Sequence, residues 1–452
     1  MQIKTGKGTI SMMVVMAIWS LSLAVDLPGL AVTPIEGSLH QYFSNVTDFK
    51  VQLLTVLPNV IIIPFVLLSG KLSETKHKIA VITAGTIMYI VAGAWSLFTN
   101  SLNGLIWLSC LLGAGCGLIL PFSTGLIADV FTGKYRMKQM GIISAIGNIA
   151  LVGATFVVGF LATKNWHLPF LVYLIPLVSL VLIPFLKKIP QSDYASDPNA
   201  PAAASDSNTA AATSTTATAG AASTTATAAT KAQAPVQIPA VDANGFSTAG
   251  QHVKGGFYIG RTIWLLLAYF FFVFATSVPA YYLPNLMPDY HMSVEDVSTV
   301  TSIFYLAMFV IGLFVTGVMK VFRKTSFILA GALVAGGMLM FVLFKTLPLY
   351  IIASSLVGLG NGLAQPIFYT KATGVVTNES KSTLSLAYLQ SANYVAISMV
   401  PVIIDFFADI FGQAKSNLFP FVIVTIFCAI VLLCIIIRVR HFTFGISKNY
   451  YE

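Results

Sequence analysis

The sequence predicts an all-α membrane protein in which twelve transmembrane helices form two six-helix bundles related by a parallel repeat. Composition is the first reason: of the 452 residues, 56% are hydrophobic and 9% are charged, whereas a soluble domain carries about 25% charged residues. The second reason is that twelve apolar stretches reach about 20 residues, the length that crosses the hydrocarbon core. The third is a set of Gly, Asn and Pro positions that recur in the second half at a nearly constant offset. Together these observations exclude an ordinary water-soluble fold.

The expected spans follow one another along the chain, six before and six after a long polar segment. Their approximate ranges are 10–33, 51–70, 79–99, 102–127, 139–162, 168–187, 260–284, 297–319, 325–345, 347–370, 382–405 and 418–437. The first follows Lys4 and Lys7 and continues without a small-residue cleavage site. Because it is longer than the apolar core of a signal peptide, we expect it to remain as the first span.

The polar segment between the sixth and seventh spans covers about 189–258. From 200 to 230, 27 of 31 residues are Ala, Ser or Thr, so no large apolar side chains are available to form a core. We expect a disordered cytoplasmic tether here, with a regulatory or sorting segment as the alternative. The expected organisation is therefore an N-terminal bundle at 1–188, the linker at 189–258, a C-terminal bundle at 259–438 and a cytoplasmic tail at 439–452.

The net charge of +9 predicts orientation rather than nucleic-acid binding, because the basic residues form no long blocks. If the N-terminus is cytoplasmic, 21 of the 25 Lys and Arg residues fall on the cytoplasmic side. The four on the other side are Lys50, Lys164, Lys345 and Lys415. This bias predicts a multi-pass protein of the cell (plasma) membrane with both termini and the linker in the cytoplasm. The expected surroundings are the lipid bilayer, with no nucleic acid.

An internal repeat supports the division into two halves. The fourth and tenth spans both read G-x-G-x-G-L-x-x-P, at 113–121 and 358–366, an offset of 245. The further pairs are Asn148 with Asn393 and Pro34 with Pro279 at the same offset, and Gly70 with Gly317 at 247. Because each copy holds an even number of spans, the repeat is parallel. The glycine string lies in the middle of a span, so it indicates close helix packing rather than a nucleotide loop.

The loop after the second span carries a family motif. It reads Gly70-Lys71-Leu72-Ser73-Glu74-Thr75-Lys76-His77-Lys78 and resembles the G-x-L-x-D-R-x-G-R-K signature of the major facilitator superfamily, with Gly70, Leu72, Glu74 and Lys78 at matching positions. The resemblance covers nearly the whole chain outside the tether. It implies two bundles that rock around a central site and expose it alternately to either side of the membrane.

In this family the loop belongs to a charge network that holds one state of the cycle. Asp129, which ends the fourth span beside Lys134, Arg136 and Lys138, is the expected partner of Lys78. The alternative is a solvated basic loop whose charges only set the orientation.

Two departures concern the subfamily. Drug antiporters of this superfamily usually open the fourth-span glycine string with arginine, where this chain has Ser109, and carry a G-P-x-x-G-G motif in the fifth span, where 153–159 has no proline. Proton-coupled antiport is weakened by these departures but stays open. The segment 24–30 together with 70–78 also resembles conjugated bile salt transporters of lactobacilli.

Asp26 is the only carboxylate expected well inside an apolar span. At helical spacing Trp19 and Ser22 share its face. Polar groups inside the membrane usually face the interior of the bundle, so we expect Asp26 to take up and release a proton or to pair with a cationic solute. The alternative is a structural hydrogen bond to a neighbouring helix.

Uncharged polar side chains complete the predicted site. They are Asn148, Tyr281, Asn285, Gln365, Tyr369, Gln390, Asn393 and Tyr394. Such amides and phenols could orient a solute while apolar side chains contact its body. The alternative is that they form interhelical hydrogen bonds.

The expected substrate follows from what the spans contain. No Lys or Arg lies near the middle of any expected span, so a small, strongly anionic solute would lack its usual partner. The resemblance then implies a transporter of an amphipathic organic solute, bile-salt-like or drug-like, that acts as exchanger or proton-coupled antiporter. Proton-coupled nutrient uptake is the alternative. A membrane-embedded enzyme is disfavoured because the six histidines are scattered; we expect a monomer with no catalytic centre, metal or cofactor.

Overall fold

The structure is a computed structural model. It describes residues 2–6, 8–24, 27–29, 31–32, 39, 42–43, 48–75, 77–162, 164–187, 253–322, 325–413 and 416–437. The expectations for the tether up to 252 and for the tail at 439–452 therefore lie outside the described residues, as does Asp26.

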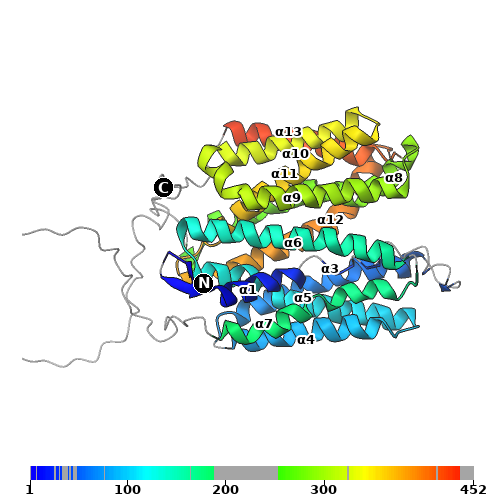
Figure 1. The fold of residues 1–452 in the computed structure, drawn as a ribbon. Coiled ribbons are helices and arrows are strands. Elements are labelled where there is room, and N and C mark those ends of the chain that lie inside the picture. The colour runs from blue at the N-terminus through cyan, green and yellow to red at the C-terminus, as the bar shows by residue number, and fades with distance from the viewer. Residues whose placement is uncertain are drawn as a thin grey trace, which may run out of the picture.

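The first half is a helical bundle, drawn in blue to green in the lower part of Figure 1. Its elements are α1 (Met12–Ser20), η1 (Leu21–Ala24), α3 (Asp48–Leu72), α4 (Lys78–Ser96), α5 (Leu102–Val130), α6 (Gly133–Ala162), η3 (Leu168–Leu174) and α7 (Leu177–Leu186). The second half lies above it, in green to red. It comprises α8 (Ile259–Leu286), η4 (Pro288–Tyr290), α9 (Val294–Phe322), α10 (Ser326–Leu343), α11 (Leu347–Ala372), η6 (Glu379–Lys381), α12 (Ser382–Ile410) and α13 (Phe419–Ile437).

The expected membrane architecture is confirmed. Ten helices in the described part of the chain are long and apolar enough to cross a bilayer, and two shorter apolar helices, Met12–Ala24 and Phe419–Cys434, stand at the first and last expected spans. Large apolar side chains face outward at the membrane boundary: Trp95 is 64% exposed, Phe98 79% and Trp107 76%. Such outward-facing apolar side chains suit a surface that contacts lipid, and Trp is typical of membrane–water interfaces.

The glycine strings are packing devices, as expected. A Cβ on Gly113 would lie 2.6 Å from the carbonyl oxygen of Pro58 in α3, and one on Gly115 would lie 2.7 Å from the amide nitrogen of Tyr89 in α4. In the second half, a Cβ on Gly360 would lie 2.7 Å from the carbonyl oxygen of Ala330 in α10. A Cβ on Gly358 would lie even closer to the carbonyl oxygen of Phe304 in α9. Alternate glycines therefore let α5 and α11 each pack against two neighbours at backbone contact.

Two short β-hairpins add to the expected all-α fold. The strands β1 (Gln2–Lys4) and β2 (Thr9–Ser11) pair antiparallel before α1, and β3 (Val253–Lys254) pairs with β4 (Phe257–Tyr258) before α8. The end of the expected linker is thus a hairpin. The first hairpin lies at the left in Figure 1, at the end of the molecule where α7 ends and α8 begins, which we call the linker end.

Candidate functional site

The candidate site lies where the two halves meet. In the first half α3, α5 and α6 form the interface, and in the second half α9, α11 and α12 do. Across this interface α6 packs against α9 and α11, while α12 packs against α3 and α5. The hydrogen bonds between the halves described below join residues in the linker-side parts of these helices.

A polar chain crosses the interface from α6 to α11. Ser144 Oγ donates to Gln365 Oε1 at 2.6 Å, and Gln365 Nε2 donates to the hydroxyl of Tyr369 at 3.1 Å. On the α6 side, Asn148 Nδ2 donates to the carbonyl oxygen of Ser144 at 2.7 Å. Three predicted residues, Asn148, Gln365 and Tyr369, are therefore brought together. Ser144 shares their face of the site and completes the chain.

A second crossing joins α12 to α5. Gln390 Nε2 donates to the carbonyl oxygen of Leu120 and to Thr124 Oγ1, both at 3.3 Å. Gln390 is only 3% exposed, and its Oε1 has no hydrogen-bond partner among the described residues. A buried acceptor without a donor costs free energy. This oxygen could therefore accept a hydrogen bond from a water, from a solute hydroxyl, or from a donor on a neighbouring helix after a rearrangement.

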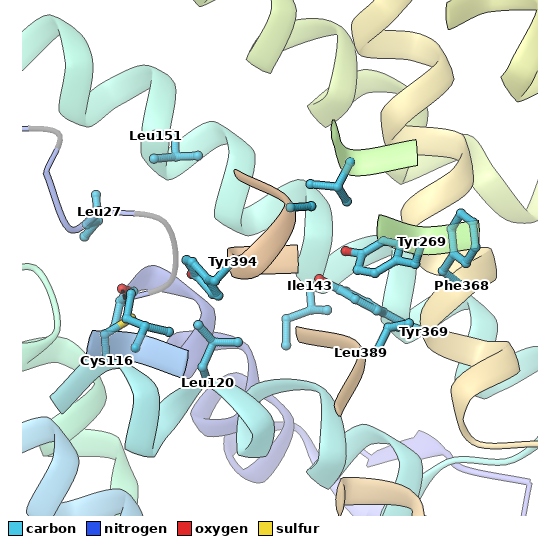
Figure 2. Packing of buried hydrophobic residues seen from close by; sticks show 14 of the residues in the cluster. Leu27, Cys116, Leu120, Ile143, Leu151, Tyr269, Phe368, Tyr369, Leu389 and Tyr394 are labelled. Carbon is cyan, nitrogen blue, oxygen red and sulfur yellow. Dashed lines mark hydrogen bonds between the residues drawn. The ribbon is translucent and has the colours of Figure 1, made fainter. Parts of the chain in front are cut away.

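Apolar side chains of both halves surround these polar groups. Figure 2 shows Tyr394 of α12, Leu120 of α5, Ile143 of α6 and Tyr369 of α11 among the buried hydrophobic residues of one cluster. The hydroxyl of Tyr269 in α8 donates to Asn393 Oδ1 at 3.3 Å, and Tyr394 is buried. The predicted pair Asn393 and Tyr394 thus sits among aromatic and aliphatic groups, as a site for an amphipathic ligand requires.

The first span contributes a third contact. Trp19 Nε1 donates to Gln139 Oε1 of α6 at 2.9 Å, a partner that the sequence did not suggest. Ser22 is buried and donates to the carbonyl oxygen of Trp19 at 2.7 Å, a local helix bond. Asp26 lies outside the described residues, but Leu27 directly after it is fully buried. The described chain is therefore inside the bundle at Leu27.

The remaining predicted residues lie toward the end of α8 away from the linker. Tyr281 is half-buried and Asn285 is exposed, while the neighbouring Tyr282 donates its hydroxyl to Asp405 Oδ1 at 3.2 Å. The sequence missed Asp405 because the eleventh span was expected to end there, whereas α12 continues to Ile410. Asp405 is exposed and lies about one turn before the end of α12, so the prediction that Asp26 is the carboxylate well inside a span stays a prediction.

The motif loop forms the expected ion pair. Lys78 Nζ lies 2.9 Å from Asp129 Oδ2, so the predicted partner of Lys78 is confirmed. Leu72 is half-buried and Glu74 is exposed. Gly70 faces α12, where an added Cβ would come within 3.1 Å of Leu384 Cδ1 and closer to Ala387. The motif therefore combines a glycine contact between the halves with a charge pair inside the first half.

Arg136 has the most extensive contacts of the basic cluster. Its Nε donates to the carbonyl oxygen of Phe131 at 2.7 Å and its Nη2 to that of Ala128 at 2.8 Å. These carbonyls end α5, where a positive charge also complements the helix dipole. Its Nη1 donates across the interface to Thr373 Oγ1 at 2.9 Å.

Metal binding and histidine chemistry have less support among the described residues than solute binding does. No group of three or more His, Cys, Asp or Glu side chains that could hold a metal occurs among them. Outside the spans, partial burial lowers the pKa of His167, whose Nε2 lies 3.0 Å from Asn100 Oδ1. This histidine is held in a loop contact of the first half, away from the linker end.

Comparison with known sequences places the chain in a family. The family model described as Major Facilitator Superfamily matches residues 9–260 and 265–444. The chain is 31% identical over 120 residues to the multidrug transporter protein MdtP of Bacillus subtilis (strain 168). The matched stretch covers 26% of this chain and 22% of that protein. It is 30% identical over 114 residues to the quinolone resistance protein NorA of Staphylococcus aureus (strain MRSA252). That match covers 25% of this chain and 29% of that protein. The match thus spans about a quarter of the length of these relatives.

Solved structures share the fold over nearly the whole chain. The human organic anion transporter MFSD10 (TETRAN) superposes with a TM-score of 0.61 at 14% identity, covering 93% of this chain and 99% of that one. The proton:xylose symporter XylE, bound to 6-bromo-6-deoxy-D-glucose, gives a TM-score of 0.64 at 12% identity, covering 94% and 95%. At such identities the likeness concerns the fold alone.

Proposed function

Because the chain belongs to the major facilitator superfamily, we propose that it is a secondary active transporter that moves an amphipathic organic solute across the cell membrane. It would work by alternating access, as an exchanger or a proton-coupled antiporter. The observation that carries the proposal is the hydrogen-bonded chain Asn148–Ser144–Gln365–Tyr369, which spans both halves. A solute that competes for these bonds would change how the halves hold each other.

The chemistry of the interface supports an amphipathic solute. The polar groups around Gln365 and Gln390 are uncharged amides and hydroxyls, with buried apolar residues such as Leu120 and Ile143 in the same region. Lys371, in the last turn of α11, is the nearest base to this region along that helix, and its Nζ lies 5.5 Å from the centre of the Phe327 ring. A solute with a large apolar body and one polar end suits such a surface better than a small multivalent anion.

The partial matches to MdtP and NorA support drug-like solutes within this class, since the names of these proteins describe multidrug transport and quinolone resistance. The predicted orientation supports the further proposal that the linker end faces the cytoplasm. With this end held together, the structure would correspond to a state that receives solute from outside.

Counterflow in proteoliposomes tests the proposal. Vesicles holding purified protein are preloaded with taurocholate, with ethidium or with glucose, and entry of the labelled compound is followed. We expect preloading to accelerate entry of at least one amphipath but not of glucose. Acceleration with glucose alone would instead indicate sugar uptake, and no acceleration by any amphipath would refute the exchanger.

A matched pair of variants links the activity to the site. Gln365→Ala removes both hydrogen bonds of Gln365, and we expect about a tenfold loss of counterflow. Ser355→Ala, on the same helix, removes only a local bond from Ser355 Oγ to the carbonyl oxygen of Ile351 at 2.8 Å. Its rate should stay near that of the wild type. Equal rates in the two variants would show that the polar chain does not contribute to transport.

A further inference from the structure

We infer that the two hairpins, the two loops that they contact and Arg136 form one hydrogen-bonded band that holds the linker end closed. The inference rests on alternating access, as proposed above. It concerns a part of the molecule that the solute need not touch. The band consists of residues 2–11, 128–136, 373–381 and 253–258.

The first hairpin holds the loop between α5 and α6. The amide nitrogen of Thr132 donates to the carbonyl oxygen of Thr5 at 3.0 Å, and Thr132 Oγ1 reaches the same oxygen at 3.5 Å. Gly6, at the turn, has a φ of +90° and lies against the Thr132 side chain. Thr132 in turn accepts at its carbonyl oxygen from the amide of Arg136 at 3.3 Å. The hairpin is thus connected directly to the first turn of α6.

The second hairpin holds the loop between α11 and α12. The amide of Tyr258 donates to the carbonyl oxygen of Val375 at 3.0 Å, and the amide of Thr377 donates to that of Gly256 at 2.9 Å. Lys381 Nζ donates to the carbonyl oxygen of Gly255 at 2.7 Å. Phe257 also packs against Tyr388 of α12, with ring centres 5.6 Å apart. This hairpin therefore fixes the beginning of α12.

The two attachments are copies of each other. Thr132 and Thr377 are 245 positions apart, the offset that also relates Asn148 to Asn393. Each threonine donates its amide to a hairpin carbonyl, and each hairpin runs directly into the first helix of its half. Each attachment thus ties the first helix of a half to the loop before its fifth helix, so these elements should move together as one body.

Among the described residues, Arg136 is a base that joins the two copies. Arg136 and Lys381 occupy equivalent positions, again 245 apart. Lys381 binds the hairpin of its own half, whereas Arg136 reaches Thr373 in the other half. Because the other two donors of Arg136 are held by the end of α5, its guanidinium is fixed in place before it crosses the interface. Opening of the linker end must break the bond to Thr373.

The equivalence of Arg136 and Lys381 provides a matched test. The four native cysteines are replaced by serine. Spin labels are then attached at Ala80→Cys and Val321→Cys, two positions that are exposed near the linker end. The full-length protein is studied in nanodiscs. Distances are measured by double electron–electron resonance. We expect Arg136→Gln to raise the ratio of long to short distances about tenfold, the effect of one lost charged hydrogen bond. Lys381→Gln removes the same charge at the same membrane face but breaks a bond within the second half only, so it should change the ratio far less than Arg136→Gln.

Two further variants guard against a folding defect. Thr373→Val keeps the charge of Arg136 and should shift the ratio in the same direction, without adding to the effect of Arg136→Gln in the double variant. Deletion of residues 2–8 should give a smaller shift of the same sign. A thermal unfolding scan of each variant confirms that the protein is folded. If Arg136→Gln and Lys381→Gln give the same distances, the band does not control the linker end. Because no solute is present, this outcome is independent of the counterflow result.

Discussion

The two halves of the molecule share a scaffold but differ at the positions that face each other. Ser144 of α6 meets Gln365 of α11 through a 2.6 Å hydrogen bond, and the repeat-equivalent positions hold Leu389 of α12 and Leu120 of α5. Arg136 crosses the interface, while its counterpart Lys381 stays within its own half. The glycine strings, by contrast, do the same work in both halves. Duplication has thus kept the packing, while these paired positions are polar in α6 and α11 and apolar in α12 and α5.

The largest expected effect concerns a carboxylate that only one half carries. Asp26 has Phe271 as its counterpart at the offset of 245. If Asp26 carries the coupled proton, Asp26→Asn should abolish transport driven by a pH gradient, because an amide cannot exchange a proton, while solute binding persists. Transport in proteoliposomes and a thermal-shift titration measure the two properties. Undiminished pH-driven transport would remove the coupling role.

The next effect tests the polar side of the interface. The double variant Ser144→Leu with Gln365→Leu makes that side resemble Leu389 and Leu120. We expect at least about a tenfold loss of transport, because the hydrogen bonds between the halves and to Tyr369 are removed together. Leu389→Met, a change of similar volume on the apolar side, serves as control and should have little effect. A double variant with normal transport of every solute would show that the asymmetry has no functional meaning.

A smaller effect is expected for the ion pair inside the first half. Lys78 and Asp129 are partly exposed, at 33% and 23% of their side chains, and such pairs contribute about 0–1 kcal/mol. Lys78→Gln should therefore lower the melting temperature by only a few degrees at most, about what this free energy implies. The exchange Lys78→Asp with Asp129→Lys should restore it. A large drop that the exchange does not restore would assign Lys78 a different role.

The smallest effect compares the two hairpins. Thr377 Oγ1 donates to Gly256 at 3.1 Å, whereas the equivalent bond of Thr132 is 3.5 Å long, and both backbone bonds survive substitution. Thr377→Val should speed amide exchange in 253–258 by about two- to fivefold, as expected for a weak hydrogen bond. Thr132→Val should change exchange in 2–11 less. Hydrogen exchange with mass spectrometry compares them, and the reverse order would contradict this view of the hairpins.

The fold was accessible from the sequence because its determinants are local or periodic. Span length, the glycine strings and the motif loop each depend on residues near one another, and they predicted the bundles and the partner of Lys78. The bonds from Ser144 to Gln365 and from Arg136 to Thr373 join residues more than two hundred positions apart, and no spacing rule selects such partners. The sequence did not predict the hairpins because strands of two or three residues are too short to show a periodic pattern. Asp405 was missed because helix ends are uncertain by a few residues.

The glycine strings also constrain how this protein can change over generations. Backbone contact on two sides leaves α5 and α11 no room for even a methyl group at Gly113, Gly115, Gly358 or Gly360. Larger residues there should destabilise the fold regardless of the solute. The facing positions on α6 and α12 hold side chains, Ser144 and Leu389, in place of backbone contacts. A lineage adapting to a new compound should therefore accumulate its substitutions on these two helices, while α5 and α11 stay nearly constant.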